Sequence, residues 1–212
     1  ELINQIMDLS KIEAGMLTLE AIQTDMQALL DNCIGIVKFA ADAKSLKLIL
    51  NIDHHMPRFA VVDPVQLRQM LINLLGNAVK FTAKGEVELK VGYEPLGGNK
   101  GKFTFAVRDT GIGISEDYRK TIFEAFSQAD ASTTRKYGGS GLGLAISSRI
   151  AKRMGSRLDF ESTVGEGTVF FFDLIAETVY GSSSCASVAD SQQPSFIKAR
   201  PFAPYQNPSR RG

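Results

Sequence analysis

Apolar residues recur at helical spacing in four parts of the chain and alternate with polar residues in five others. The helical pattern predicts helices over residues 1–14, 24–44, 64–82 and 142–154. Asp63 and Pro64 form a start signal for the third helix, with Asp as the N-cap and Pro at the first helical position. A fifth helix is expected near residues 116–126.

Alternating patterns predict strands, which we place at residues 46–52, 86–93, 102–109, 157–162 and 167–176. The glycine-rich turn "EPLGGNKG" joins the second and third strands, which are therefore expected to pair antiparallel. The segment "DHHMP" is expected to be a loop. Strands and helices in this irregular order predict an α+β fold, a two-layer α/β sandwich with helices on one face of the sheet and an additional N-terminal helix.

Composition narrows the class of protein. The chain has 212 residues, of which 44% are apolar, and this is enough for one domain with extensions. Its 24 basic and 23 acidic residues give a net charge of +1, so the overall charge predicts neither a nucleic-acid partner nor an anionic membrane surface. Two cysteines make no disulfide framework, and no apolar run reaches the roughly 18 residues of a membrane span. The low cysteine count fits a reducing compartment, so we expect a cytoplasmic location. The sequence opens on Glu1 in a helical pattern, so we expect it to be a piece of a longer chain. A membrane anchor elsewhere in that longer chain is compatible with both expectations.

The stretch "TRKYGGSGLGLAI" at residues 134–146 holds four glycines in six residues. It matches neither the G-x-G-x-x-G spacing of a dinucleotide fold nor the G-x-x-x-x-G-K-[ST] spacing of a P-loop. Glycines let a backbone approach a ligand closely, and the N-terminus of the helix that follows favours an anion. The same glycines also suit a flexible hinge before a core helix, and this stretch by itself leaves both interpretations open.

The predicted helix 64–82 carries unusual polar residues beside its apolar stripe. Asn73, Asn77 and Lys80 are spaced i, i+4 and i+7 and share one edge of the helix. Asn is a mediocre helix former, so two of them within a strong helix favour a functional role over solvated polar positions. A carboxamide oxygen suits Mg²⁺ held mainly through phosphates, and a lysine supplies charge to the same phosphates.

The segment "RDTGIGI" places Asp109 at the end of a predicted strand, followed by Gly111 and Gly113. A carboxylate accepts hydrogen bonds and so matches the amino group of adenine, whereas guanine offers a carbonyl at that position. The alternative is a simple strand-ending turn.

Five segments together resemble the nucleotide-binding boxes of the sensor histidine kinase ATP-binding domain. They are "NLLGNAVKFT", "DTGIGI", "IFEAFSQAD", "RKYGGSGLGLAI" and "GEGTVFFF", in this order, within residues 60–175. The resemblance implies the Bergerat-type α/β sandwich that the family shares with gyrase, the Hsp90 chaperones and MutL, with a mixed, mostly antiparallel sheet. The N-terminal "LINQIMDLSKIEAGMLTLE" resembles the end of the second helix of the family's dimerisation and phosphoacceptor hairpin.

The resemblance implies roles for individual residues, with ATP and Mg²⁺ as cofactors. Asn77, assisted by Asn73, would bind the metal ion, and Asp109 would bind the adenine amino group. Residues 127–140 would form a mobile lid, poorly ordered over 128–140 without nucleotide. The implied catalytic residues are Asn73, Lys80, Arg135 and Lys136. The implied nucleotide-binding residues are Asn73, Asn77, Lys80, Asp109, Gly111, Gly113, Ile114, Phe123, Phe126, Arg135, Lys136, Tyr137, Gly139, Gly141, Leu142, Gly143, Leu144 and Thr168.

Asn73 distinguishes a kinase from its hydrolytic relatives. Gyrase-like and Hsp90-like members have a Glu four residues before the metal-binding Asn, and that Glu activates water. A carboxamide accepts no proton from water at neutral pH, so hydrolysis is expected to be poor and catalysis to rest on positioning and charge neutralisation. Two alternatives are an ATP-hydrolysing clamp of the gyrase or chaperone kind and a nucleotide-binding regulatory module without kinase activity.

The resemblance also predicts the organisation of the chain. Residues 1–20 would be the end of the hairpin and its linker, 21–178 the catalytic domain, and 179–212 a disordered tail rich in Ser and Pro. His54 and His55 lack the context of the family's phosphoacceptor, so the chain is expected to bind ATP without phosphorylating itself. The implied partners are the hairpin, which forms the homodimer of the full-length kinase, and a receiver domain, which hybrid kinases carry in the same chain.

Overall fold

A seven-stranded sheet is the centre of the computed structural model, which describes residues 6–7, 9–10, 12, 14–126 and 140–179. The strands run in the order β1-β3-β7-β5-β4-β2, and β6 also pairs with β7. Only the β2–β4 pair among the described strands is parallel, which confirms a mixed, mostly antiparallel sheet. The strands are β1 Ile22–Asp25, β2 Lys47–Ile52, β3 Phe59–Val62, β4 Glu86–Gly97, β5 Lys100–Asp109, β6 Asp159–Thr163 and β7 Gly167–Val179.

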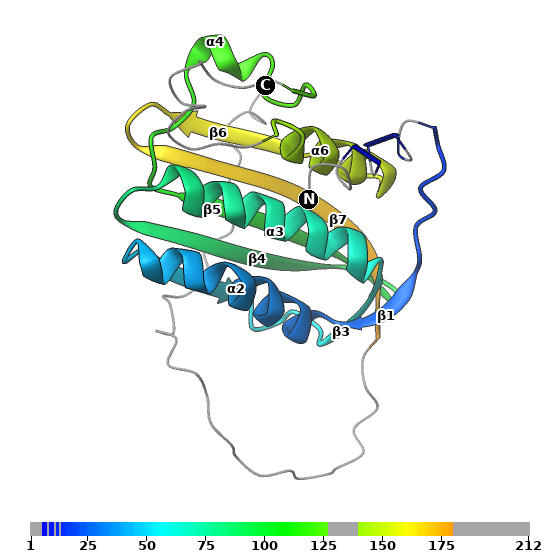
Figure 1. Cartoon of the computed structure of the whole chain (residues 1–212). Coiled ribbons are helices and arrows are strands. Elements are labelled where there is room, and N and C mark those ends of the chain that lie inside the picture. The colour runs from blue at the N-terminus through cyan, green and yellow to red at the C-terminus, as the bar shows by residue number, and fades with distance from the viewer. Residues whose placement is uncertain (1–5, 8, 11, 13, 127–139, 180–212) are drawn as a thin grey trace, which may run out of the picture.

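Three helices cover one face of this sheet (Figure 1). The helices α2 (Met26–Ala43), α3 (Pro64–Phe81) and α6 (Gly143–Arg153) lie side by side, with α3 between the other two. The core lies between the two layers, where apolar side chains of α3 meet the phenylalanines of the central strands. The largest fully buried side chains include Leu67, Met70, Leu71, Leu74, Phe103, Phe105 and Phe172.

The start of α3 follows from its sequence. Asp63 is the N-cap, and its Oδ1 accepts hydrogen bonds from the N–H groups of Val65 and Gln66 at 3.0 and 2.9 Å. Pro64 fills the first helical position, where a missing N–H has no cost. The polar residues of the helix thereby take fixed positions relative to the buried stripe.

The structure differs from the sequence prediction in three elements. The helix expected near residues 116–126 is wrong: α4 covers only Glu116–Arg119, and turns follow it. The chain turns inward there because Ile122 is buried and the Phe123 ring packs edge-to-face on Phe160, with the centroids 5.7 Å apart. The sequence patterns also missed β1 and β3, each of four residues.

The N-terminal segment packs on the same core. Residues 6, 7, 9, 10 and 12 are helical, and Leu9 and Ile12 are buried. Arg153, the last residue of α6, donates hydrogen bonds from Nη2 to the carbonyl oxygens of Gly15 and Leu17 at 2.9 and 2.6 Å. Among the described residues, no helix is long and apolar enough to cross a membrane.

Candidate functional site

The polar edge of α3 meets the first turns of α6. Asn73 donates from Nδ2 to Ser147 Oγ at 2.8 Å, and Ser147 is fully buried. A Cβ atom on Gly143 would lie well under 3.0 Å from Asn73 Oδ1, so any larger residue there would displace the Asn73 carboxamide. Asn77 is half-buried one turn farther along, and within the described residues no hydrogen bond engages its carboxamide. The two amides therefore lie at the junction of α3 with the glycine-rich segment.

Lys80 follows on the same edge as a half-buried cation. Burial lowers the pKa of its ammonium group below the ordinary value, and no carboxylate among the described residues forms an ion pair with it. The Nζ atom lies 4.8 Å from the centroid of the Phe81 ring. An anion at this position would favour the charged form of Lys80, which suits the predicted contact with phosphate.

Asp109 ends β5 as a buried carboxylate, with 7% of the residue exposed. Burial raises the pKa of its carboxyl group, although hydrogen bonds from the N–H groups of Gly111 and Thr168 oppose the shift. Gly111 donates to Oδ1 at 2.8 Å. A carboxylate can accept about four hydrogen bonds, so Asp109 retains acceptor capacity for a ligand that donates one.

The floor beside Asp109 includes Ser162, a residue that the sequence analysis missed. Its Oγ accepts a hydrogen bond from the N–H of Ile114 at 2.8 Å and donates to the carbonyl oxygen of Gly167 at 2.9 Å. The same Oγ lies 2.9 Å from Thr168 Oγ1. Ser162 and Thr168 face each other across the β6–β7 hairpin. Pairing the two predicted strands in this register would have identified Ser162 from the sequence.

Close backbone contacts join the Asp109 turn to the end of α3. The N–H of Ile112 donates to the carbonyl oxygen of Phe81 at 3.4 Å, and a Cβ on Gly111 would collide with that oxygen. Gly113 has a φ of 70° and lies against the carbonyl of Thr163. The structure thus brings the predicted adenine-binding turn beside the predicted metal and phosphate edge, two segments about 30 residues apart in sequence.

The remaining predicted site residues lie within or near residues 127–139. The N–H of Phe126, which has a φ of 63° and an exposed ring, donates to the carbonyl oxygen of Gly141 at 3.2 Å. Leu142 is fully buried, whereas Ile114, Phe123 and Leu144 are half-buried against the core. Arg135, Lys136, Tyr137 and Gly139 lie outside the described residues, as does the expectation of poor order, except for residue 140.

Lys44 is a second residue that the sequence analysis did not identify. It is the C-cap residue of α2, and its ammonium group donates to three carbonyl oxygens at the end of α3. The distances are 2.7 Å to Val79, 2.8 Å to Lys80 and 3.2 Å to Thr82. A cation at a helix C-terminus satisfies carbonyls that lack helical partners. Lys44 therefore fixes the turn that carries Lys80. The same turn contacts the segment after Asp109, because the carbonyl oxygen of Phe81 lies against Gly111 and accepts a hydrogen bond from the N–H of Ile112.

Comparison with known proteins agrees with this geometry. Residues 62–178, more than half of the chain, match the family described as histidine kinase-, DNA gyrase B- and HSP90-like ATPases. The chain belongs to this ATPase family. The match begins at the end of β3 and includes α3, the Asp109 turn, the glycine-rich segment and most of β7, so every predicted site residue lies within the family domain.

Relatives of the ATPase domain are sensor kinases. The chain is 39% identical over 173 residues to the signal transduction histidine-protein kinase BarA of Escherichia coli and 42% identical over 173 residues to the sensor protein GacS of Pseudomonas syringae. Each match covers 82% of this chain and 19% of the relative, so the chain spans about a fifth of their length. A hybrid signal transduction histidine kinase of Dictyostelium discoideum is 39% identical over 87% of this chain and 17% of its own.

Solved structures confirm the predicted fold of the ATPase domain. Full-length ShkA, crystallised in complex with AMPPNP, superimposes with a TM-score of 0.71 at 32% identity, over 85% of this chain and 36% of ShkA. The Acinetobacter baumannii histidine kinase AdeS shares the fold, with a TM-score of 0.64 at 18% identity, over 81% of this chain and 75% of that chain.

Replacing Lys44 with methionine is expected to destabilise the ATPase domain by about 1–2 kcal/mol, because three carbonyls at the end of α3 lose their charged donor. We also expect weaker ATP binding, since the last turn of α3 loses its anchor. Urea unfolding and an ATP titration measure the two effects. Lys38→Met is the matched control, because among the described residues Lys38 pairs only with Asp42, on the exposed face of α2, and it should change stability by less than about 0.5 kcal/mol. Equal effects of the two substitutions would show that the Lys44 contacts contribute nothing.

Proposed function

We propose that the chain is the catalytic domain of a sensor histidine kinase of the hybrid type. It binds ATP with Mg²⁺ and transfers the γ-phosphate to a histidine on a dimerisation hairpin, for relay to a receiver aspartate. The observation that carries the proposal is the position of Asn73, whose carboxamide joins α3 to α6 through Ser147 and Gly143. A carboxamide provides no general base for water, so the site suits transfer to a protein acceptor better than hydrolysis.

Nucleotide recognition begins at Asp109. The carboxylate oxygen that Gly111 does not engage would accept a hydrogen bond from the adenine amino group, and guanine lacks this donor. Gly113, Ile114 and Thr168 would line the base pocket around it. A buried acceptor without a donor is costly, so this arrangement selects ATP over GTP.

The triphosphate would lie over the polar edge of α3. Asn77, with Asn73 beside it, offers the neutral oxygen ligands that fit Mg²⁺, and the Asn77 carboxamide has no hydrogen-bond partner among the described residues. When bound, Mg²⁺ would neutralise charge on the phosphates. Lys80 would add a positive charge at the same edge, and Arg135 and Lys136 would supply two more from the segment 127–140.

The rest of the chain would connect this domain to its partners. We assign residues 1–20 to the end of the hairpin and its linker, 21–178 to the catalytic domain, and 179–212 to a tail toward a receiver. The burial of Leu9 and Ile12 on the domain core supports a linker that rests on the catalytic domain. The hairpin would form the homodimer of the complete kinase, and the domain would act in the cytoplasm.

Two assays test the proposal. Calorimetric titration should show binding of ATP that depends on Mg²⁺, and Asn77→Ala should remove that dependence. Phosphate from γ-labelled ATP should then appear on a supplied phosphoacceptor hairpin of a related kinase, with little free phosphate released. Brisk hydrolysis without transfer would favour the clamp ATPase, and binding with neither reaction would favour a regulatory module.

A further inference from the structure

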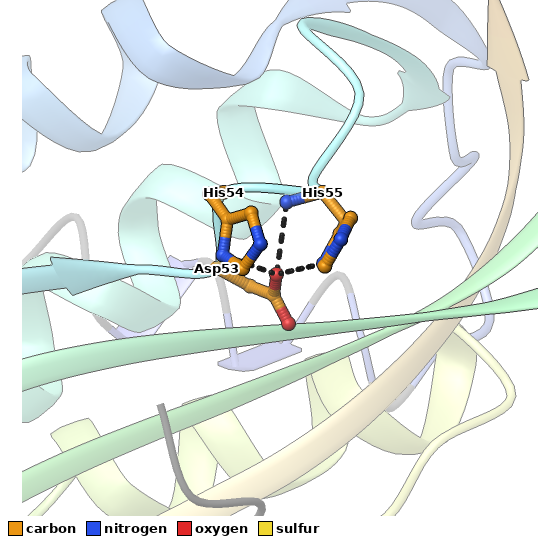
Figure 2. A group of neighbouring side chains, drawn as sticks. All are labelled: Asp53, His54 and His55. Carbon is orange, nitrogen blue, oxygen red and sulfur yellow. Dashed lines mark hydrogen bonds and ion pairs between the residues drawn. The ribbon is translucent and has the colours of Figure 1, made fainter. Parts of the chain in front are cut away.

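Three ligand-bearing side chains converge directly after β2, away from the nucleotide site. They belong to Asp53, His54 and His55 (Figure 2), and among the described residues they are the one group that brings three metal-ligating atoms together. The side chain of Asp53 is buried, with 7% exposed, whereas 79% and 71% of the His54 and His55 side chains are exposed. A buried carboxylate thus forms the floor of a site that opens to solvent between two imidazoles.

The loop that carries these residues is held at both ends. The N–H of Asp53 donates to the carbonyl oxygen of Val91 on β4 at 2.9 Å, and the N–H of Met56 donates to the carbonyl oxygen of Asp53 at 3.0 Å. Pro57 is buried, and the carbonyl oxygen of Arg58 accepts a hydrogen bond from the N–H of Met26 at 2.8 Å. The backbone that carries the three ligands is therefore positioned before any ion arrives, which lowers the entropic cost of binding.

The distances match a metal centre. Asp53 Oδ1 lies 3.2 Å from His55 Nδ1 and 3.8 Å from His54 Nδ1, and one ligand atom from each residue falls within 4.8 Å of the others. A tetrahedral ion with ligands at about 2.1 Å separates them by about 3.4 Å. We propose that Asp53, His54 and His55 bind a first-row divalent transition metal such as Zn²⁺, with the remaining coordination position open to water.

The ligand chemistry separates this site from the proposed Mg²⁺ site. Imidazole favours Zn²⁺, Ni²⁺ or Cu²⁺, whereas Mg²⁺ requires oxygen ligands. The N–H of Asp53 donates a hydrogen bond to the carbonyl oxygen of Val91 on β4. Val91 lies four residues along β4 from Val87, which pairs with Asp109 on β5. At about 3.3 Å per residue, the cluster and the strand end that carries Asp109 are about 13 Å apart along the strand alone.

A simple turn explains only part of the cluster. Asp53 Oδ1 accepts a hydrogen bond from the N–H of His55 at 2.9 Å, which is a common way for Asp to stabilise a turn. That bond requires no imidazole at position 54 or 55. The two rings nevertheless lie close together, with centroids 3.7 Å apart and planes tilted by 42°, and both direct a nitrogen toward the same carboxylate.

Titration of the tag-free, 212-residue chain with Zn²⁺ against a chromophoric chelator tests the site. The background variant carries Cys185→Ser, because that cysteine, outside the described residues, is a competing ligand. One equivalent of Zn²⁺ should bind, and the imidazole NMR signals should shift; His54 and His55 are the chain's two histidines, so these signals are unambiguous. Mg²⁺ and Ca²⁺ at the same concentration should leave the signals unchanged.

Single substitutions decide whether all three ligands act together. His54→Gln and His55→Gln should each weaken Zn²⁺ binding by at least about tenfold, since even indirect partners of a metal site contribute 10–100-fold. Asp53→Asn should do the same, and its thermal unfolding shows whether the turn survives. Stoichiometric binding that either histidine variant leaves unchanged would overturn the proposal, as would the absence of binding in the background variant. ATP binding by His54→Gln should equal that of the background variant, which separates this site from the proposed function.

Discussion

Replacing Asp109 with asparagine is expected to weaken ATP binding by about 100-fold or more while the domain stays folded. One carboxylate oxygen accepts the N–H of Gly111, and in the proposed pocket the other accepts the adenine amino group. In the asparagine variant that position becomes an NH₂ group, and two donors then face each other in a buried pocket. The loss of a charged hydrogen bond together with an unsatisfied donor costs about 3–4 kcal/mol, which corresponds to roughly 100–1,000-fold in affinity.

The same substitution should leave the nucleotide-free domain at least as stable at neutral pH. Burial raises the pKa of Asp109 in the folded state, so its contribution to stability is present in acid and is lost as pH rises through the folded-state pKa. Asparagine removes the cost of burying the charge. Thermal unfolding of the two proteins should therefore differ most at neutral pH and converge in acid.

An isothermal titration with ATP measures the affinity, and Asp173→Asn is the matched control. Asp173 is an exposed residue of β7 that accepts a hydrogen bond from Thr104 at 2.7 Å, so its replacement makes the same change in charge outside the pocket. Asp173→Asn should bind ATP normally. Unchanged affinity in Asp109→Asn would refute the proposed recognition of adenine.

The parts of the fold that depend on local signals were predictable from sequence. The Asp63-Pro64 start of α3 and the β4–β5 hairpin are confirmed because caps, turns and apolar periodicity act over a few residues. The short strands were not predictable in this way. β1 forms only through pairing with β3, and β3 only through β1 and β7, which lies more than 100 residues away. Four-residue strands carry too little alternation to be recognised alone.

The residues of the candidate site that local spacing marks were also predictable, whereas those that depend on contacts distant in sequence were not. Spacing on one helix placed Asn73, Asn77 and Lys80 together, and a strand end identified Asp109. Lys44 was missed because its partners lie 35 to 38 residues away and are backbone carbonyls, which leave no trace in side-chain patterns. The segment at Asp53 was predicted only as a loop, since only the structure shows that this carboxylate is buried beneath the two rings.

The β6–β7 turn supplies the second large effect, because it holds the backbone of the Asp109 strand end. Gly167 has a φ of 120°, and a Cβ there would lie well under 3.0 Å from the carbonyl oxygen of Asp109. Neither atom belongs to a flexible side chain, so Gly167→Ala must displace one of the two backbones. We expect destabilisation of about 3–4 kcal/mol and a loss of ATP binding, since overpacking and an unfavourable φ act together.

Gly165→Ala in the same turn isolates the second contribution. Gly165 also has a positive φ, 82°, but open space surrounds the position that a Cβ would occupy. This variant should lose only about 1–2 kcal/mol, the cost of a left-handed conformation for alanine. Urea unfolding gives both stabilities, and an ATP titration below the transition tests the pocket. Equal losses in the two variants would mean that φ alone matters at this turn, and that the packing of Gly167 on Asp109 does not shape the adenine site.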